Sequence, residues 1–166
     1  MMKAILLFLF LPLIAFKVIA QNQISSDSLT LPDFRFYTVT DSTVFTRDSL
    51  EMGKPIVLIY FKTDCPYCQA MTKNIVAGFD SLRAYQVVMI STHSPELMRN
   101  YAHENGLDKL PVRMLHDPSN RIHDYYHFEY IPLVCLYDQY RKRIYAHEGR
   151  MTVKGILYRF GQGGKR

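Results

Sequence analysis

Two continuous apolar runs define the centre of the chain. Ile56–Phe61 and Val87–Ile90 are rich in β-branched residues and lack the alternation of a half-exposed strand, which predicts strands buried on both faces. Between them, Ala70, Met71, Ile75 and Phe79 recur at helical spacing. The pattern therefore predicts a strand-helix-strand unit.

Shorter patterns flank this unit. Apolar residues on either side of Asp41-Ser42, from Phe34 to Phe45, predict a β-hairpin, and Ser94-Pro95-Glu96 opens a helix that Gly106 closes. The remaining elements follow in order: a helix over 120–128, strands over 132–137 and 143–147, and a closing helix through Val153, Ile156, Leu157 and Phe160. These elements predict an α/β fold in which helices cover both faces of a central mixed sheet, with the hairpin as an N-terminal extension.

The first twenty residues have the form of an export signal. Lys3 precedes an apolar stretch, 4–16, that is shorter than the about 20 residues of a membrane-spanning helix. We expect cleavage after Ala20 and a periplasmic or secreted protein; an uncleaved signal anchor, which would tie the protein to the membrane, is the alternative. No cysteine precedes Cys65 that could carry a lipid. We expect a flexible lead-in over 21–30, one folded domain over 31–160 and a flexible tail over 161–166.

The charge and the cysteine content of the chain limit the range of functions to be considered. The formal net charge is +5, two of the positive charges lie in the signal, and the others are dispersed, so we expect no nucleic-acid binding. Three cysteines are too few for the disulfide framework of a small secreted domain. Two of them form a single C-x-x-C motif, which indicates catalysis.

The motif is Cys65-Pro66-Tyr67-Cys68, directly between the predicted strand and helix. A helix N-terminus stabilises a thiolate, the form of cysteine that attacks disulfides, and proline is well tolerated in the first helical turn. Cys68 lies one turn further on, where it can attack the resulting mixed disulfide. We therefore predict Cys65 and Cys68 as catalytic residues, with Pro66 and Tyr67 forming the active-site loop.

Purely structural roles for the cysteines fit the sequence less well. A permanent disulfide would close a very short loop and add little stability, and a zinc site would need two more ligands. Cys135 stands alone in a predicted strand, where we expect a small core hydrophobe. Only His123 and His127 share a helix face, without a third ligand in register, so we predict no metal site and no cofactor.

The motifs together resemble the thioredoxin-like thiol-disulfide oxidoreductases of the bacterial cell envelope, within the redoxin family. The resemblance extends over 31–160. It is carried by the cysteine motif and by Leu31-Pro32-Asp33-Phe34, Gly53-Lys54-Pro55, Phe61, Asp117-Pro118, Ile131-Pro132 and Gly149.

The resemblance implies a thioredoxin-like fold and a redox-active disulfide that is exchanged with cysteine-containing proteins or with small thiols. It also implies a membrane or envelope partner that resets the pair, and we expect a monomer. In that family a cis-proline at the position of Pro132 lies against the cysteines, and the backbone of the preceding residue, here Ile131, pairs with the substrate.

Two departures from thioredoxins proper affect the expected chemistry. Ile59 stands in place of the buried carboxylate that accepts a proton from the second cysteine, and Asp64 stands in place of the tryptophan before the first. Pro66-Tyr67 is the dipeptide typical of glutaredoxins, which brings glutathione into consideration. Whether the pair reduces, oxidises or isomerises disulfides stays open.

Three other functions are less consistent with the residues. A peroxidase of the peroxiredoxin kind needs a threonine three positions before its cysteine, where this chain has Lys62 or Cys65. A copper chaperone on this fold spaces its cysteines by three residues and adds a histidine. A redox-inert peptide-binding module would not need both cysteines.

Overall fold

The computed structural model describes residues 30–163, in which seven strands form one mixed sheet. The spatial order is β2-β1-β5-β4-β3-β6-β7. The strands are β1 (Arg35–Thr38), β2 (Val44–Thr46), β3 (Ile56–Tyr60), β4 (Gln86–Ser91), β5 (Val112–His116), β6 (Leu133–Tyr137) and β7 (Arg143–Glu148). The three central strands β3, β4 and β5 are parallel, and the outer pairs are antiparallel.

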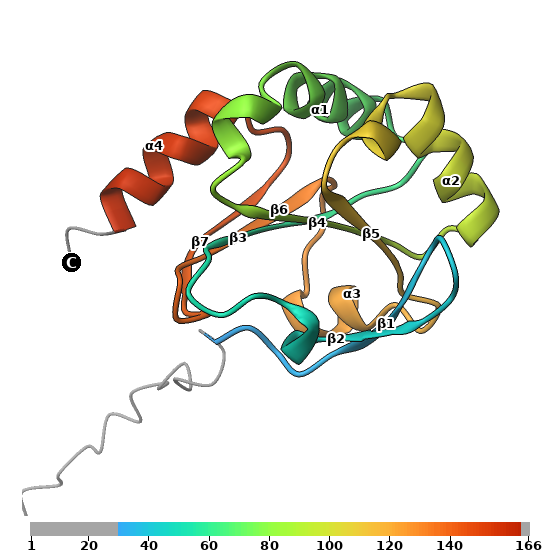
Figure 1. Ribbon diagram of the computed structural model, residues 1–166, viewed down its shortest axis with the longest axis horizontal. Coiled ribbons are helices and arrows are strands. Elements are labelled where there is room, and N and C mark those ends of the chain that lie inside the picture. The colour runs from blue at the N-terminus through green and yellow to red at the C-terminus, as the bar shows by residue number, and fades with distance from the viewer. Residues whose placement is uncertain (1–29, 164–166) are drawn as a thin grey trace, which may run out of the picture.

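Helices cover both faces of this sheet, as predicted. They are α1 (Pro66–Ala77), α2 (Pro95–Glu104), α3 (Arg121–Tyr126) and α4 (Val153–Gly163). Figure 1 shows α1, α2 and α4 above the sheet and α3 below it. The arrangement is a thioredoxin-like α/β fold with the predicted N-terminal hairpin, β1 and β2.

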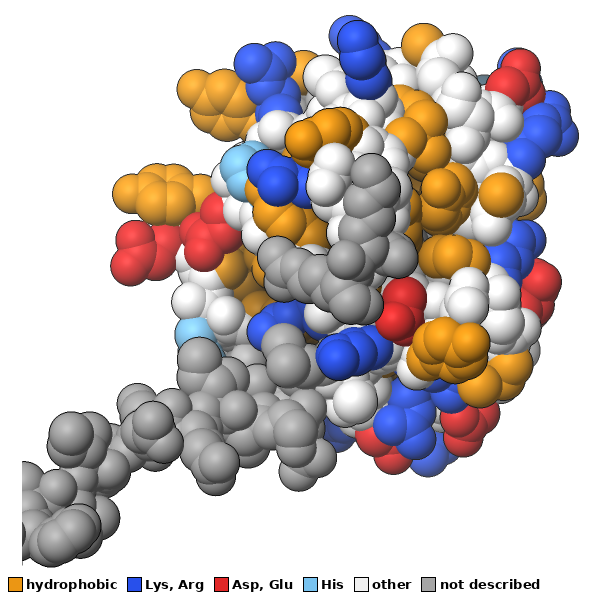
Figure 2. Space-filling view, turned by 90° about the vertical axis from the view of Figure 1, so that its left-hand side faces the viewer, with side chains coloured by type: hydrophobic (Ala, Val, Ile, Leu, Met, Phe, Trp, Pro, Cys, Tyr) orange, Lys and Arg blue, Asp and Glu red, His pale blue; other side chains and the backbone are white. Residues whose placement is uncertain are grey.

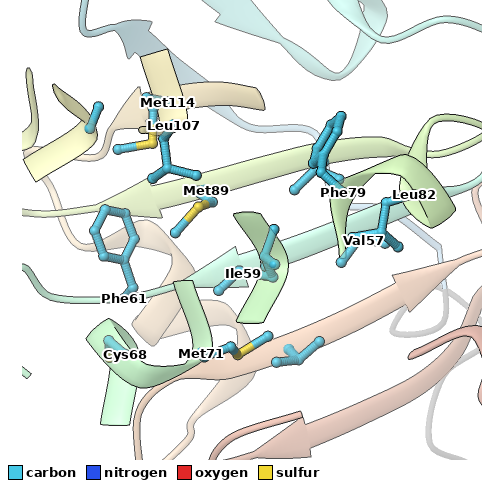
Figure 3. Close-up of a cluster of buried hydrophobic side chains, with 14 of the residues drawn as sticks. Val57, Ile59, Phe61, Cys68, Met71, Phe79, Leu82, Met89, Leu107 and Met114 are labelled. Atoms are coloured by element: carbon cyan, nitrogen blue, oxygen red, sulfur yellow. The ribbon is translucent and has the colours of Figure 1, made fainter. Parts of the chain in front are cut away.

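The side chains on the two faces of strand β3 belong to two different hydrophobic clusters. Val57, Ile59 and the following Phe61 pack with residues of α1, α2 and α4, whereas the intervening side chains pack with residues of α3 and the N-terminal segment. All five residues of β3 are buried, which explains the absence of polar alternation in its sequence. Figure 3 shows Ile59 and Phe61 on the face that Cys68 and Met71 of α1 cover.

The sequence-based prediction missed strand β5. It placed no strand between the helix at 94–106 and the helix at 120–128. Val112–His116 pairs in parallel with β4 and, at its other edge, with β1. The strand is short and only Met114 and Leu115 are buried in it, so its sequence lacks a continuous apolar run. The hairpin is therefore part of the central sheet through β5.

Three predicted helices differ at their ends. Gly78 ends α1, so Phe79 lies in a 3-10 turn, and α3 stops before His127, which adopts a left-handed conformation. Helix α4 continues to Gly163, three residues past the expected domain end.

The predicted signal at 1–20, most of the lead-in and residues 164–166 lie outside the described residues. Within 30–163, no helix has both the length and the apolar character needed to span a membrane.

Candidate active site

The two cysteines of the motif lie where β3 runs into α1. Cys65 is the N-cap of α1, Pro66 occupies the first turn, and the Cys65 Sγ accepts a hydrogen bond from the Cys68 N–H at 3.2 Å. Such N–H groups at a helix start have no partner within the helix and stabilise a negative charge placed on them. The Cys68 Sγ donates to the Cys65 Sγ at 2.6 Å, and both cysteines are free thiols.

The two thiols differ in their surroundings. Cys65 is partly exposed, whereas Cys68 is 1% exposed and packs in the cluster beneath α1. Burial, and then its hydrogen bond to Cys65, raises the pKa of Cys68 from 9.0 to about 12. Cys68 is therefore a protonated donor at neutral pH, with its hydrogen directed at the more accessible sulfur.

The loop before Cys65 is held by side chains that sequence analysis did not single out. His93 Nδ1 lies 2.7 Å from the Thr63 hydroxyl, and Gln69 donates its side-chain N–H to the Thr63 carbonyl at 2.9 Å. His93 Nε2 lies 3.8 Å from the Asp64 carboxylate. His93 follows β4, and because β3 and β4 are parallel neighbours, the ends of both strands meet at one edge of the sheet.

Ile131 and Pro132 lie at the same edge. Their peptide bond is cis, as the resemblance implied. The β3–β6 register pairs Tyr60 with Leu133, so the residues just before Leu133 lie beside those just after Tyr60 on the way to Cys65. In the described part of the chain, the backbone N–H and C=O of Ile131 take part in no hydrogen bond.

Strand β7 fixes the loop that carries these residues. The Glu148 Oε2 accepts from the backbone N–H groups of Glu129 at 3.0 Å and Tyr130 at 2.8 Å. The Gly149 N–H donates to the Pro132 carbonyl at 2.8 Å. The segment after β7 is thereby joined to the loop beside the cysteines.

The aromatic ring of Tyr67 is a further feature of the motif. Tyr67 is 63% exposed, and the Arg150 guanidinium carbon lies 5.6 Å from the centroid of its ring. At this distance a cation is attracted by the face of an aromatic ring. Sequence analysis placed Tyr67 in the active-site loop but gave no role to Arg150.

Cys135 is fully buried, as expected for a core residue. It packs in the cluster on the α3 side of the sheet, whereas Cys68 packs on the other side. Burial raises the pKa of Cys135 to about 12. The sheet separates this thiol from the pair.

Metal ligands do not gather around the pair. Across residues 30–163, no three His, Cys, Asp or Glu side chains lie close enough together to hold a metal ion. Ile59 is 1% exposed among apolar side chains, in place of the carboxylate of thioredoxins.

Neither the surface charge nor the cavities indicate a particular ligand at the site. Figure 2, turned by 90° from Figure 1, shows basic, acidic and apolar side chains interspersed on one face. A hollow of about 510 Å³ borders the active-site loop at Thr63, Asp64 and Gln69. A cavity of about 450 Å³ lies between β5, α2 and the hairpin, and contains neither cysteine.

Comparison with known protein families gives one match. The model of a family described as the AhpC/TSA family matches residues 28–142 of the 166. No match was found among curated proteins.

Solved structures share the fold at low sequence identity. A secreted Mycobacterium tuberculosis disulfide oxidoreductase, described as homologous to E. coli DsbE, is 20% identical with a TM-score of 0.64, covering 86% of this chain and 100% of that one. The exposed lipoprotein thioredoxin of Streptococcus pneumoniae is 22% identical with a TM-score of 0.62, covering 79% and 99%. The structure described as MTB dsbF is 20% identical with a TM-score of 0.65, covering 82% and 97%.

Proposed function

The chain belongs to the AhpC/TSA family, and from that premise we propose that it is an extracytoplasmic thiol-disulfide oxidoreductase. One observation carries the proposal: an accessible sulfur at a helix N-terminus, with a buried thiol 2.6 Å behind it. This geometry supports an attacking role for Cys65 and a resolving role for Cys68. The secreted and exposed proteins that share the fold support the location.

The exchange needs no cofactor. The Cys65 thiolate attacks one sulfur of a substrate disulfide, an S–S bond forms between Cys65 and the substrate, and the other substrate sulfur leaves as a thiolate. Cys68 then loses its proton and attacks the Cys65 Sγ, which forms the Cys65–Cys68 disulfide and releases the second substrate thiol. Two electrons pass from the dithiol to the substrate. The reverse sequence oxidises a substrate dithiol.

The substrate segment lies along Ile131 and Pro132 in this proposal. The free backbone N–H and C=O of Ile131 sit at the edge where the cysteines emerge, and Glu148 and Gly149 fix the loop there. A cysteine-containing protein segment can add its backbone at that edge. A dithiol partner in the membrane or envelope would reset the pair after each cycle.

Trapping experiments test which cysteine attacks the substrate and which one resolves the mixed disulfide. In a Cys68→Ser variant the first exchange stops at the mixed disulfide, so covalent complexes with envelope proteins should accumulate. They should not accumulate with Cys65→Ser, in which the remaining thiol is buried. Cys135→Ala is the control, because that buried thiol takes no part.

Complexes are read on non-reducing gels and identified by mass spectrometry. Equal trapping by both active-site variants, or by neither, would contradict the proposal. The mass of the exported chain shows whether cleavage follows Ala20.

A further inference from the structure

The surface beside the reactive sulfur carries an exposed ring with a cation on it. Tyr67 lies between the two cysteines in sequence, and most of its side chain is exposed. Arg150 approaches the face of this ring, with its guanidinium carbon 5.6 Å from the ring centroid. An arginine stacked on a ring is held in a defined place and loses less freedom when it binds a ligand.

The backbone also fixes Arg150 next to the substrate edge. Gly149, the residue before it, donates to the Pro132 carbonyl at 2.8 Å. The side chain of Arg150 therefore contacts the helix that carries the cysteines, while its backbone adjoins the loop that carries Ile131. A substrate paired along Ile131 would pass directly beside it.

No carboxylate in the described part of the chain pairs with the charge of Arg150. None of the ion pairs among residues 30–163 involves Arg150. The two carboxylates nearest in sequence to this part of the site have other partners. Asp64 faces His93, and Glu148 accepts two backbone N–H groups from the loop.

We propose that Arg150, positioned on the ring of Tyr67, selects substrates that carry a carboxylate next to the reacting cysteine. A guanidinium offers parallel N–H donors that match the two oxygens of a carboxylate. The carboxylate can belong to an acidic residue of a protein segment or to a small acidic thiol such as glutathione. The inference rests on the proposed function and names its substrate class.

Matched disulfides test this selectivity. Three peptide dimers, identical except for Glu, Gln or Lys beside the cysteine, are reduced by the reduced protein, and the second-order rate constant is measured for each. An exposed charge pair changes such a constant by about three- to fivefold, so the wild type should prefer Glu over Gln by about that factor and disfavour Lys. High salt should remove the preference.

Variants assign the effect to Arg150. In Arg150→Gln the Glu-to-Gln ratio should fall to about one, and Arg150→Lys should restore part of it. Tyr67→Ala should weaken the preference while Tyr67→Phe keeps it, because the ring positions the guanidinium. Arg159→Gln is the matched control: it removes an equal charge, stacked on Tyr145 at 4.2 Å, from helix α4.

The outcomes separate this inference from the function on which it rests. A wild-type protein that reduces all three dimers at equal rates, or an Arg150→Gln variant with an unchanged ratio, overturns the selectivity alone. A wild-type protein that reduces none of them overturns both. Oxidised glutathione compared with its ester, whose carboxylates are masked, distinguishes a small acidic thiol from an acidic protein segment.

Discussion

The unequal environments of the three cysteines predict unequal reactivity. We consider three variants that each keep one cysteine and replace the other two by serine or alanine. Cys65 is partly exposed at the helix start, whereas Cys68 and Cys135 are 1% and 0% exposed. The Cys65-only variant should react rapidly with iodoacetamide, and the other two slowly.

The size of the difference in alkylation rate follows from the raised pKa of the buried thiols. A rise from 9.0 to about 12 lowers the thiolate fraction of Cys68 near neutral pH roughly a thousandfold. A more basic thiolate is also a stronger nucleophile, which recovers roughly twenty- to thirtyfold, so the net loss is roughly thirty- to fiftyfold before access is considered. Burial, the largest cause of the shift, persists when Cys65 is replaced.

The assay is alkylation rate against pH, followed by mass. The rates of the Cys68-only and Cys135-only variants should keep rising through pH 10, because the raised pKa of each thiol leaves most of it protonated there. In urea all three variants should react alike. A Cys68-only variant that reacts in the folded state as fast as the Cys65-only variant would refute the assignment of Cys68 as the protected, resolving thiol.

Two further changes are informative. Glu148→Gln replaces the charged acceptor of two backbone N–H groups, so disulfide exchange should slow about fivefold while the urea midpoint of unfolding barely moves. Glu129→Gln is the control: its side chain does not hold the loop, so neither the exchange rate nor the midpoint should change. Tyr137→Phe leaves the Tyr126 hydroxyl without its partner and should cost about 1 to 3 kcal/mol at neutral pH. Burial raises the pKa of Tyr137 above 10.0, so this group contributes stability to the wild type that is present below pH 10 and is lost as the pH rises further. The Tyr137→Phe variant should therefore lose less stability than the wild type above pH 10. Thermal unfolding of both proteins against pH measures this difference.

The parts of the fold that the sequence predicted are those whose pattern is complete within one contiguous segment. Strand β3 is buried throughout, and its run of apolar residues is unambiguous. In α2 the local signals agree, because Ser94 caps the helix, Pro95 occupies its first turn and Gly106 follows it with a positive φ of 72°. Strand β5 has mixed surroundings, and its pairing with β1 joins residues that are 77 and 79 positions apart in the sequence.

The same distinction holds for the site. Cys65 and Cys68 were predictable because strand, motif and helix are contiguous in the sequence. His93 and Arg150 were not, since they reach the motif only through the parallel pairing of β3 with β4 and the hydrogen bond from Gly149 to Pro132. A side chain brought in by tertiary structure leaves no local pattern.

The missing carboxylate at Ile59 shapes the second half of the exchange. Cys68 must lose a proton to attack the mixed disulfide, yet within residues 30–163 its only side-chain hydrogen-bond partner is Cys65. In the mixed disulfide the Cys65 sulfur carries no charge and accepts a proton poorly. The proton then has to pass to the departing substrate sulfur or to water, so resolution is coupled to the basicity of the leaving thiol. The mixed disulfide should therefore persist longer than in a protein that carries a buried acid at this position, and longest for substrates whose thiolate is the most basic and so the poorest leaving group.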